Sequence, residues 1–358
     1  MIKRFLTMLI AFTFVFICAC GPTPSPLPAP TPAEDGKTIW FTDSAGRGVL
    51  VPKTINRIIP SGISAQIVLY SLAPDLLAGL AEQWPPEAEP FIETAYTGMP
   101  VVVIDENTTH ENILAANAQI IIDIGFTQPS TAASMDAAAA KTGLPAVHIS
   151  SSIEQMPEMY RTLGALLNRE DRAEELARFC ERTLDAALKS AASAGENGRL
   201  SVLYCLEEGG LSVMPRGSQE SAVIDMLADN LATGETPPSG MGVPVSMEQM
   251  RNYDPDVIFF APEHTYESVA SDPVWHELKA VQSGRYYEIP LGPFNWMGFP
   301  PSINQYLSML WAAKLLYPQH AAYDLYSEVS DFFKLFYRHE LTKEQYDLLT
   351  ANSPTPNK

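Results

Sequence analysis

The chain has 358 residues, a length that suits two lobes of ordinary size better than one small module. Hydrophobic residues make up 46% and charged residues 18%, a balance that allows a buried core and excludes general disorder. With 23 basic and 42 acidic side chains the formal net charge is −19, which repels phosphate backbones and argues against a nucleic-acid partner.

The amino terminus has the pattern of a secretory leader. The basic pair Lys3-Arg4 precedes an apolar run over residues 5–19, which is shorter than the roughly 20 residues of a membrane-spanning helix. The run ends in Ile17-Cys18-Ala19-Cys20, which resembles a bacterial lipobox with Cys20 as the lipid acceptor, although a cysteine at the middle position is unusual. We therefore expect a lipoprotein signal peptide over residues 1–19. The alternative is a plain secreted protein with an incidental cysteine.

A proline-rich segment follows the leader. Between Pro22 and Pro32 every second residue is proline, a pattern that excludes a helix or an interior strand and favours an extended spacer. We expect residues 20–37 to be a tether that holds a folded body at the outer face of the cytoplasmic membrane.

Short apolar runs alternate with helical patterns over residues 38–152. Turn-forming residues between 38–42 and 49–51 predict a hairpin. Alternation of strands and helices predicts βαβ units, a largely parallel sheet and an N-terminal lobe. The predicted strands are residues 57–59, 76–80, 101–104, 120–124 and 146–149, and the predicted helices are residues 65–72, capped by Ser64, 109–117 and 131–143.

Residues 153–195 have a different pattern. Apart from Pro157 they lack a strong helix breaker, and their apolar residues recur at helical spacing. This predicts one long helix between two lobes, or two helices with a break near Asn168.

A second alternating stretch over residues 196–351 predicts a C-terminal lobe with closing helices, followed by a polar tail at 352–358. The two stretches share their layout but contain no repeat of fixed period. The predicted strands are residues 200–206, 257–261 and 285–289, and the predicted helices are residues 220–231, 247–252, 275–280, 303–317 and 323–336, the last two amphipathic.

Several short motifs follow one another along the chain in a particular order. They are Thr42-Asp43-x-x-Gly46-Arg47, Leu72-x-Pro74-Asp75, Glu111-Asn112-Ile113-Leu114, Ser246-Met247-Glu248-Gln249, Asp254-Pro255-Asp256-Val257-Ile258 and Trp275-x-x-Leu278. Each is weak alone, but together they resemble the substrate-binding lipoproteins of ABC importers for iron-siderophores, cobalamin and haem. The resemblance spans Thr42 to about Leu349. It implies an α/β fold with two Rossmann-like lobes joined by one long α-helix, a ligand cleft between the lobes, a monomer, and capture of cargo without catalysis.

The resemblance also implies that one exposed glutamate on each lobe docks into arginine pockets of the ABC permease subunits. The matching positions are Glu111 and Glu248. A carboxylate on a rigid helix pairs with arginine in a bidentate geometry that fixes orientation. The alternative is that each glutamate is simply favoured by the dipole in the first turn of its helix.

Candidate ligand-binding residues follow the rule that loops at the carboxyl ends of strands line the crevice of an open α/β sheet. Aromatic side chains offer area to a planar or greasy chelate, and Arg216 is suited to a carboxylate or phosphate. The segment 292–304 looks like a variant common in metal and corrinoid binders of this class. Ordinary half-buried aromatic residues and a solvated arginine are the alternative reading. The candidates are residues 60–64, Trp84, Tyr96, Arg216, His264, Tyr266, Phe294, Asn295 and Trp296.

The histidines and acidic residues do not cluster into a site for a bare metal ion, and no H-E-x-x-H motif occurs. We therefore expect a chelated cargo in place of a bare ion, and the resemblance implies a ferric siderophore, haem or a corrinoid, with no permanently bound cofactor. His264 and Tyr266 are candidate axial ligands for iron or haem. Cys180 and Cys205 either pair in an oxidising compartment or remain buried thiols.

An exported enzyme and a sensor or adhesin ectodomain are the rival classes. The motifs G-x-S-x-G, G-x-x-x-x-G-K-[ST] and G-x-G-x-x-G are absent, which weighs against a hydrolase of that type or a nucleotide enzyme. A sensor on the same two lobes stays open, because a fold does not fix a function.

Overall fold

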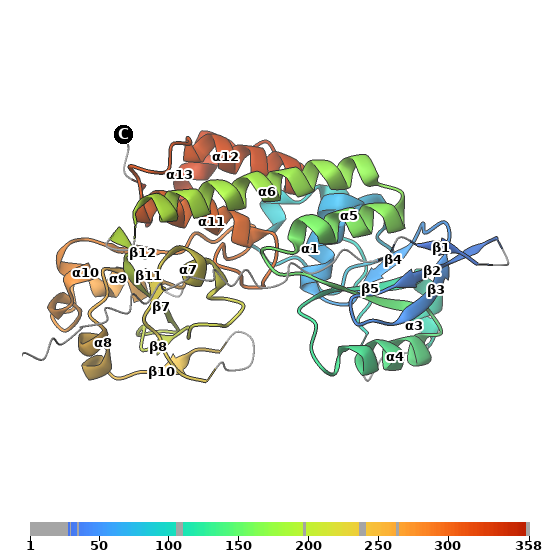
Figure 1. Cartoon of the computed structure of the whole chain (residues 1–358), viewed down its shortest axis with the longest axis horizontal. Coiled ribbons are helices and arrows are strands. Elements are labelled where there is room, and N and C mark those ends of the chain that lie inside the picture. The colour runs from blue at the N-terminus through green and yellow to red at the C-terminus, as the bar shows by residue number, and fades with distance from the viewer. Residues whose placement is uncertain are drawn as a thin grey trace, which may run out of the picture.

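The structure is a computed structural model that describes residues 28, 30–33, 36–104, 110–195, 198–235, 241–262 and 265–355. These residues form two α/β lobes, with helix α6 (Glu170–Ser193) running along both of them (Figure 1). The predicted fold class of two lobes joined by one long helix is confirmed. The predicted signal peptide over residues 1–19 and the predicted lipid acceptor Cys20 lie outside the described residues.

The N-terminal lobe is built on a parallel sheet in the order β4-β5-β6, which pairs Ile58 with Ile120 and Ile121 with Ala146. Two predicted strands at 76–80 and 101–104 are wrong as full strands, because they contribute only single bridges from Leu77 and Leu80. The elements are β4 (Ile58–Pro60), α1 (Ile63–Leu72), 3₁₀ turns Pro74–Leu76 and Glu89–Phe91, α2 (Thr94–Thr97), α3 (His110–Ala116), β5 (Ile120–Gly125), α4 (Thr131–Thr142) and β6 (Ala146–Ser150).

A hairpin sheet flanks this lobe, as predicted, with β2 (Thr38–Thr42) antiparallel to β3 (Gly48–Pro52). The short strand β1 (Thr31–Pro32) pairs with β2 from the end of the proline-rich segment. β1 lies at the edge of the sheet, where a proline costs no internal ladder hydrogen bond.

Alternate residues of the strands enter different hydrophobic clusters. Ile120 and Ile122 of β5 pack into the main core, whereas Ile121 packs into a smaller cluster on the other face. Helices therefore cover both faces of the sheet, which explains why β5 is apolar on both sides.

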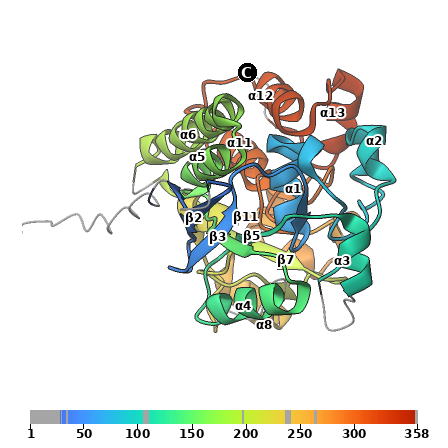
Figure 2. The same ribbon diagram turned by 90° about the vertical axis from the view of Figure 1, so that its right-hand side faces the viewer.

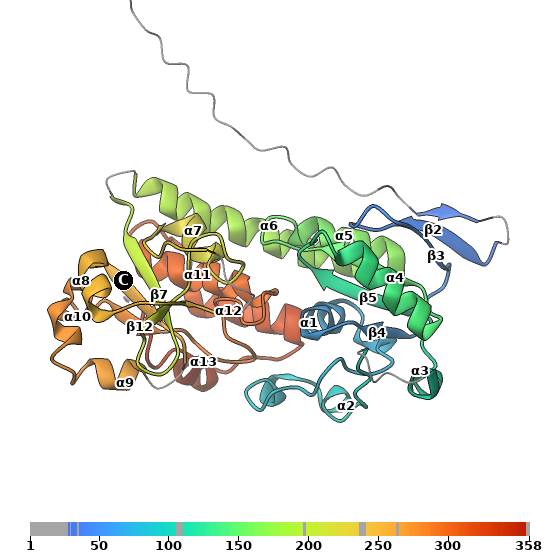
Figure 3. The same ribbon diagram turned by 90° about the horizontal axis from the view of Figure 1, so that it is seen from below.

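The interlobe segment consists of two helices, α5 (Met156–Leu167) and α6, so of the two predicted alternatives the one with a break near Asn168 is confirmed and a single helix throughout 153–195 is not. Asn168 adopts φ 55° and ends α5, with its backbone N–H donating to the carbonyl of Gly164. The chain then reverses, and α5 packs against α6 (Figure 3). At 24 residues α6 is about 36 Å long, enough to run along both lobes.

The C-terminal lobe has a mixed sheet in the order β10-β8-β7-β11-β12, with β9 also paired to β7. β7, β11 and β12 are parallel, whereas β8 is antiparallel to β7. The elements are β7 (Ser201–Leu206), β8 (Ser212–Val213), α7 (Ala222–Leu227), β9 (Asp229–Asn230), β10 (Val243–Pro244), α8 (Met247–Tyr253), β11 (Val257–Phe260), α9 (Thr265–Val269), a 3₁₀ turn Trp275–Glu277, α10 (Lys279–Gln282) and β12 (Tyr286–Glu288).

Two helices predicted in this lobe differ from the structure. The helix expected at 220–231 ends at Leu227, because the chain turns extended at Ala228 to form β9. The helix expected at 275–280 is a 3₁₀ turn followed by α10, with Leu278 extended between them.

The chain closes with α11 (Asn304–Leu316), α12 (Leu325–Phe332), a π-helical turn Phe333–Tyr337 and α13 (Lys343–Leu349). α11 was predicted to be amphipathic, but all its side chains are buried, because it packs against α6, α7 and α12. α13 was not predicted. Seen end-on, α5, α6 and α12 lie on the side of the molecule opposite α4 and α8 (Figure 2).

Candidate functional site

A cavity of about 220 Å³, which we call the interlobe cavity, lies between segments from both halves of the chain. The N-terminal half contributes the start of α1, the end of β5 and the start of α5, and the C-terminal half contributes the segment that leads into α11. The Oγ of Ser64 donates a hydrogen bond to the carbonyl of Pro301 at 3.0 Å and links the two halves at this point. The lining residues are Ser64, Gly125, Phe126, Ser151, Ser152, Met156, Gln219, Pro300, Pro301, Ser302 and Gln305.

A second cavity of about 230 Å³ lies at the carboxyl ends of β7 and β11, and we call it the C-lobe cavity. Phe299 belongs to its lining, and the next residues, Pro300 and Pro301, line the interlobe cavity. The two cavities therefore lie on either side of one loop. The lining residues are Tyr204, Leu206, Glu207, Ala261, Pro262, Leu291, Asn295 and Phe299.

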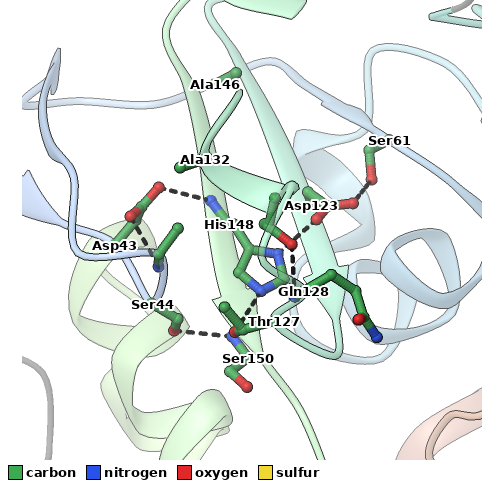
Figure 4. A network of polar contacts seen from close by, with 12 residues as sticks. Asp43, Ser44, Ser61, Asp123, Thr127, Gln128, Ala132, Ala146, His148 and Ser150 are labelled. Carbon is green, nitrogen blue, oxygen red and sulfur yellow. Dashed lines mark hydrogen bonds and ion pairs between the residues drawn. The ribbon is translucent and has the colours of Figure 1, made fainter. Parts of the chain in front are cut away.

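A polar network occupies the carboxyl edge of the N-terminal sheet (Figure 4). The ring of His148, buried on β6, bridges Asp123 at the end of β5 and Thr127, with Nδ1 2.6 Å from Asp123 Oδ2 and Nε2 2.9 Å from Thr127 Oγ1. The hydroxyl of Ser61, which follows β4, donates to Asp123 Oδ1. An ionised carboxylate only accepts hydrogen bonds, so Nδ1 of His148 carries the hydrogen.

The charge of Asp123 is stabilised by this network. Burial alone would raise the pKa of Asp123, but the hydrogen bonds from His148 and Ser61 outweigh it and lower the pKa below its ordinary value. The side chain keeps 26% exposure, so an ionised carboxylate faces solvent at the strand end two residues before Gly125 of the interlobe cavity.

Asp43 supports the same network from the hairpin. Its carboxylate is fully buried and accepts hydrogen bonds from the backbone N–H groups of Ala45, Arg47 and His148. The Arg47 guanidinium lies 3.4 Å away. The Thr42-Asp43-x-x-Gly46-Arg47 motif thus anchors the hairpin to β6 beside the candidate site.

Two predicted ligand residues, Trp84 and Tyr96, lie in an aromatic cluster. Trp84 is buried, donates its Nε1–H to the carbonyl of Tyr96, and packs edge-on against Tyr70 with ring centroids 5.4 Å apart. Phe294 is also buried, and its ring centroid lies 6.3 Å from that of Trp84. Neither Trp84 nor Phe294 lines a described cavity, and both contribute to the core.

The loop at 292–299 contains two further predicted residues. Asn295 lines the C-lobe cavity and accepts a hydrogen bond from the backbone of Met297. Trp296 is fully buried and donates its Nε1–H to the carbonyl of Gly292, a hydrogen bond within the loop that stabilises its conformation.

The other predicted ligand residues are not brought to the two cavities. Arg216 is exposed and donates to the carbonyl of Asn230 at 2.5 Å. Tyr266 packs on Tyr286 with ring centroids 5.3 Å apart, and burial, followed by the neighbouring Tyr286, raises its pKa, which disfavours an iron-binding phenolate. His264 lies outside the described residues.

Both predicted docking residues are exposed in the first turn of a helix. Glu111 lies on α3, and Glu248 lies on α8, whose start is fixed by a capping box of Ser246 and Gln249. Figures 1 and 3 place α3 and α8 near the outer ends of opposite lobes.

The interlobe cavity contains residues that the sequence reasoning missed. Phe126, Gln219 and Gln305 had no motif to mark them. A signal was available for Phe126, because it follows directly after β5, and the strand-end rule applied there selects it.

A larger cavity of about 700 Å³ lies among α11, α12, α13 and the segment after them, apart from the two cavities above. Both lysines that line it already have partners within the protein. Lys314 donates hydrogen bonds to the carbonyls of Ala321 and Tyr323, and Lys343 forms an ion pair with Asp347.

Among the described residues no group of three or more His, Cys, Asp or Glu side chains is placed to hold a metal ion. Cys180 and Cys205 are both buried free thiols. No helix in the described part of the chain has the length and apolar character needed to cross a membrane.

Comparison with known proteins gives one family match, to the model described as "Periplasmic binding protein", over residues 69–291. No curated protein matches the chain. Among solved structures, an ABC transporter solute binding protein from Sulfurospirillum deleyianum is 28% identical with a TM-score of 0.79, and the match covers 88% of this chain and 99% of that one.

Two more distant structures share the fold. The molybdate periplasmic binding protein MolA of Haemophilus influenzae is 17% identical with a TM-score of 0.66, covering 85% of this chain and 99% of that one. The catecholate-siderophore binding protein VctP of Vibrio cholerae is 16% identical with a TM-score of 0.53, covering 70% and 91%.

Proposed function

The chain belongs to the periplasmic binding protein family, and we propose that this ABC-importer solute-binding protein captures a chelated metal between its lobes and delivers it to a membrane permease. The observation that carries the proposal is the interlobe cavity, because its lining comes from both halves of the chain. A guest held there contacts both lobes and stabilises their closed arrangement by its extra affinity for it.

The preference for a chelate over a bare ion rests on the side chains at hand. The described residues offer no cluster of metal ligands, whereas the cavities present aromatic rings, hydroxyls and amides. Such groups suit the organic periphery of a chelate. Solved structures of the same fold include a catecholate-siderophore binder and a molybdate binder, so the fold accommodates a siderophore in one protein and an oxyanion in another.

The ligand is proposed to lie beside the loops that follow the strands. Asn295 belongs to the binding surface, whereas Trp84, Phe294 and Trp296 are buried and Tyr96 lies in the aromatic cluster with Trp84, so we assign these four residues a supporting role. His264 stays a prediction. We propose no catalytic step, and capture and release of the cargo are the whole cycle.

We place the protein outside the cytoplasm, as its family implies. Lipid attachment at Cys20 and the tether over residues 20–37 remain part of the proposal. They would keep a monomeric carrier close to its permease and so raise its effective concentration there.

Docking to the permease is proposed to use Glu111 and Glu248. Both are exposed, both lie in a helix's first turn, and they sit on opposite lobes. Two carboxylates held at a fixed separation suit a permease made of two similar subunits.

The test is the double variant Glu111→Ala, Glu248→Ala. We expect chelate affinity, measured by calorimetry, to stay within about twofold of the wild type, because neither residue belongs to the lining of the interlobe cavity or the C-lobe cavity. Uptake of radiolabelled chelate by cells should fall to background. The matched control Glu158→Ala removes an exposed glutamate from the first turn of α5 and should leave uptake unchanged. Full uptake by the double variant would refute the docking assignment.

A further inference from the structure

Two large apolar rings are exposed beside the candidate site, one on each lobe. Phe126 is 42% exposed and lines the interlobe cavity, and Phe299 is 44% exposed and lines the C-lobe cavity. Each follows a structural anchor: Phe126 comes after β5, and Phe299 is bridged to Asn295. Exposed aromatic rings on rigid supports are suited to covering an apolar guest surface.

The same cavities contain no basic side chain. None of the described lysines or arginines belongs to the lining of either cavity. Nor does any internal segment outside the described residues hold one, because 34–35, 105–109, 196–197, 236–240 and 263–264 contain neither lysine nor arginine in the sequence. Arg216, three residues from Gln219, donates its guanidinium to the carbonyl of Asn230.

Acidic groups, by contrast, are present at the C-lobe cavity and at the edge of the N-terminal sheet. Glu207 lines the C-lobe cavity, and the partly exposed carboxylate of Asp123 stands at the edge of the N-terminal sheet. The whole chain carries a formal net charge of −19. An anionic guest would therefore lose hydration without gaining a cationic partner.

From this juxtaposition we propose that the cargo is a metal chelate without net negative charge, whose apolar surface is covered by Phe126 from one lobe and Phe299 from the other. The inference rests on the proposed function and narrows it. It favours neutral or cationic chelates, such as hydroxamate siderophores or corrinoids, and disfavours trianionic catecholate complexes, haem with its two propionates, and small oxyanions.

The test uses the full-length protein in detergent and calorimetric titration with four probes. These are ferrichrome and cyanocobalamin, which are uncharged, and ferric enterobactin and molybdate, which are anionic. We expect at least one uncharged probe to bind at least about 100-fold more tightly than either anion. Phe126→Ala and Phe299→Ala should each weaken that binding about tenfold.

Trp40→Ala is the matched control, because Trp40 is an aromatic residue 51% exposed on β2 and lines neither cavity. It should leave the Kd unchanged. Circular dichroism of each variant checks its fold, which we expect to be unchanged because the removed rings are exposed.

Tight binding of enterobactin or molybdate in preference to the uncharged probes would overturn the charge inference while leaving capture by the cleft intact. An unchanged Kd in both phenylalanine variants would overturn the role of the rings. Failure to bind any chelate would overturn the proposed function as well.

Discussion

At the scale of single residues, the site depends on groups that fix one another. Asp123 is held by His148 and Ser61, and the ring of His148 is fixed in turn by Thr127 (Figure 4). Ser61 follows β4, Asp123 and Thr127 belong to β5 and the loop after it, and His148 lies on β6, so the network ties the three strands together.

Removing the charge at Asp123 should change how stability depends on pH. The pKa of Asp123 is lower in the folded chain than its unfolded value of about 3.9, so its ionised form stabilises the fold above that pH. This contribution is lost as the pH falls through the folded pKa. Asp123→Asn should therefore lower the free energy of unfolding by about 1–3 kcal/mol at pH 7 and by less at pH 3.

Urea unfolding at the two pH values measures this difference. Asp331→Asn, which removes an exposed carboxylate from α12, is the control and should cost less than about 0.5 kcal/mol at pH 7. An equal loss for Asp123→Asn at pH 7 and pH 3 would contradict the electrostatic explanation.

Residue positions were predictable from sequence only where a local rule or motif applies. The motifs around Glu111 and Glu248 predict an exposed glutamate on each lobe, and both are exposed in the first turn of a helix, while their docking role stays a prediction. Ser64 was expected to cap α1, but α1 begins at Ile63 and the Ser64 hydroxyl donates instead to Pro301. That partner is 237 positions away in the chain, and no local pattern indicates it.

At the scale of elements, the long helix α6 packs closely against α5. Gly164 faces α6, and a Cβ built there would overlap the Cβ of Ala173. The absence of a side chain lets the two helices approach closely. Arg161 adds an ion pair from α5 to Glu174 on α6 at 2.7 Å.

Gly164→Val should push the two helices apart. We expect the free energy of unfolding to fall by about 1–3 kcal/mol, since the buried contact cannot absorb the extra volume without displacement. Chemical unfolding followed by circular dichroism measures it. Ala165→Val is the matched control: Ala165 is exposed on the same helix, so only helix propensity changes, by about 0.5 kcal/mol. Equal losses in both variants would show that no tight contact exists at Gly164.

Elements were predicted best where periodicity and burial agree. β5, β6, β7 and β11 are mainly apolar runs and were located within a residue or two. α11 was assigned an exposed face it does not have, because the sequence does not reveal that α6, α7 and α12 enclose it. The break at Asn168 was one of two alternatives, since an asparagine adopts a left-handed conformation only where the following chain reverses.

At the scale of the whole molecule, a group of arginines gathers along the interlobe helices, and none of them lines either cavity. Arg161, Arg169, Arg172, Arg178 and Arg182 all lie on α5 and α6 or between them, and most pair with glutamates or aspartates there. The cavities are left without basic side chains among the described residues. The total charge follows from the sequence, but this distribution does not, because it depends on which helix faces each cavity.

Because of this distribution, binding of the cargo and docking to the permease should depend on salt to different degrees. If the cargo has no net negative charge, ligand binding involves little Coulomb energy, and its Kd should change less than about threefold between 50 and 500 mM NaCl. Docking through Glu111 and Glu248 to arginine pockets involves opposite charges, so its association rate should fall about tenfold or more over the same range. Stopped-flow fluorescence with permease in proteoliposomes measures the docking rate, and calorimetry measures the Kd of the cargo.

The double variant Glu111→Ala, Glu248→Ala should show slow docking that depends much less on salt. A Kd that rises steeply with salt would mean that the cargo is held by charge, and a docking rate insensitive to salt would mean that the two glutamates do not guide the encounter.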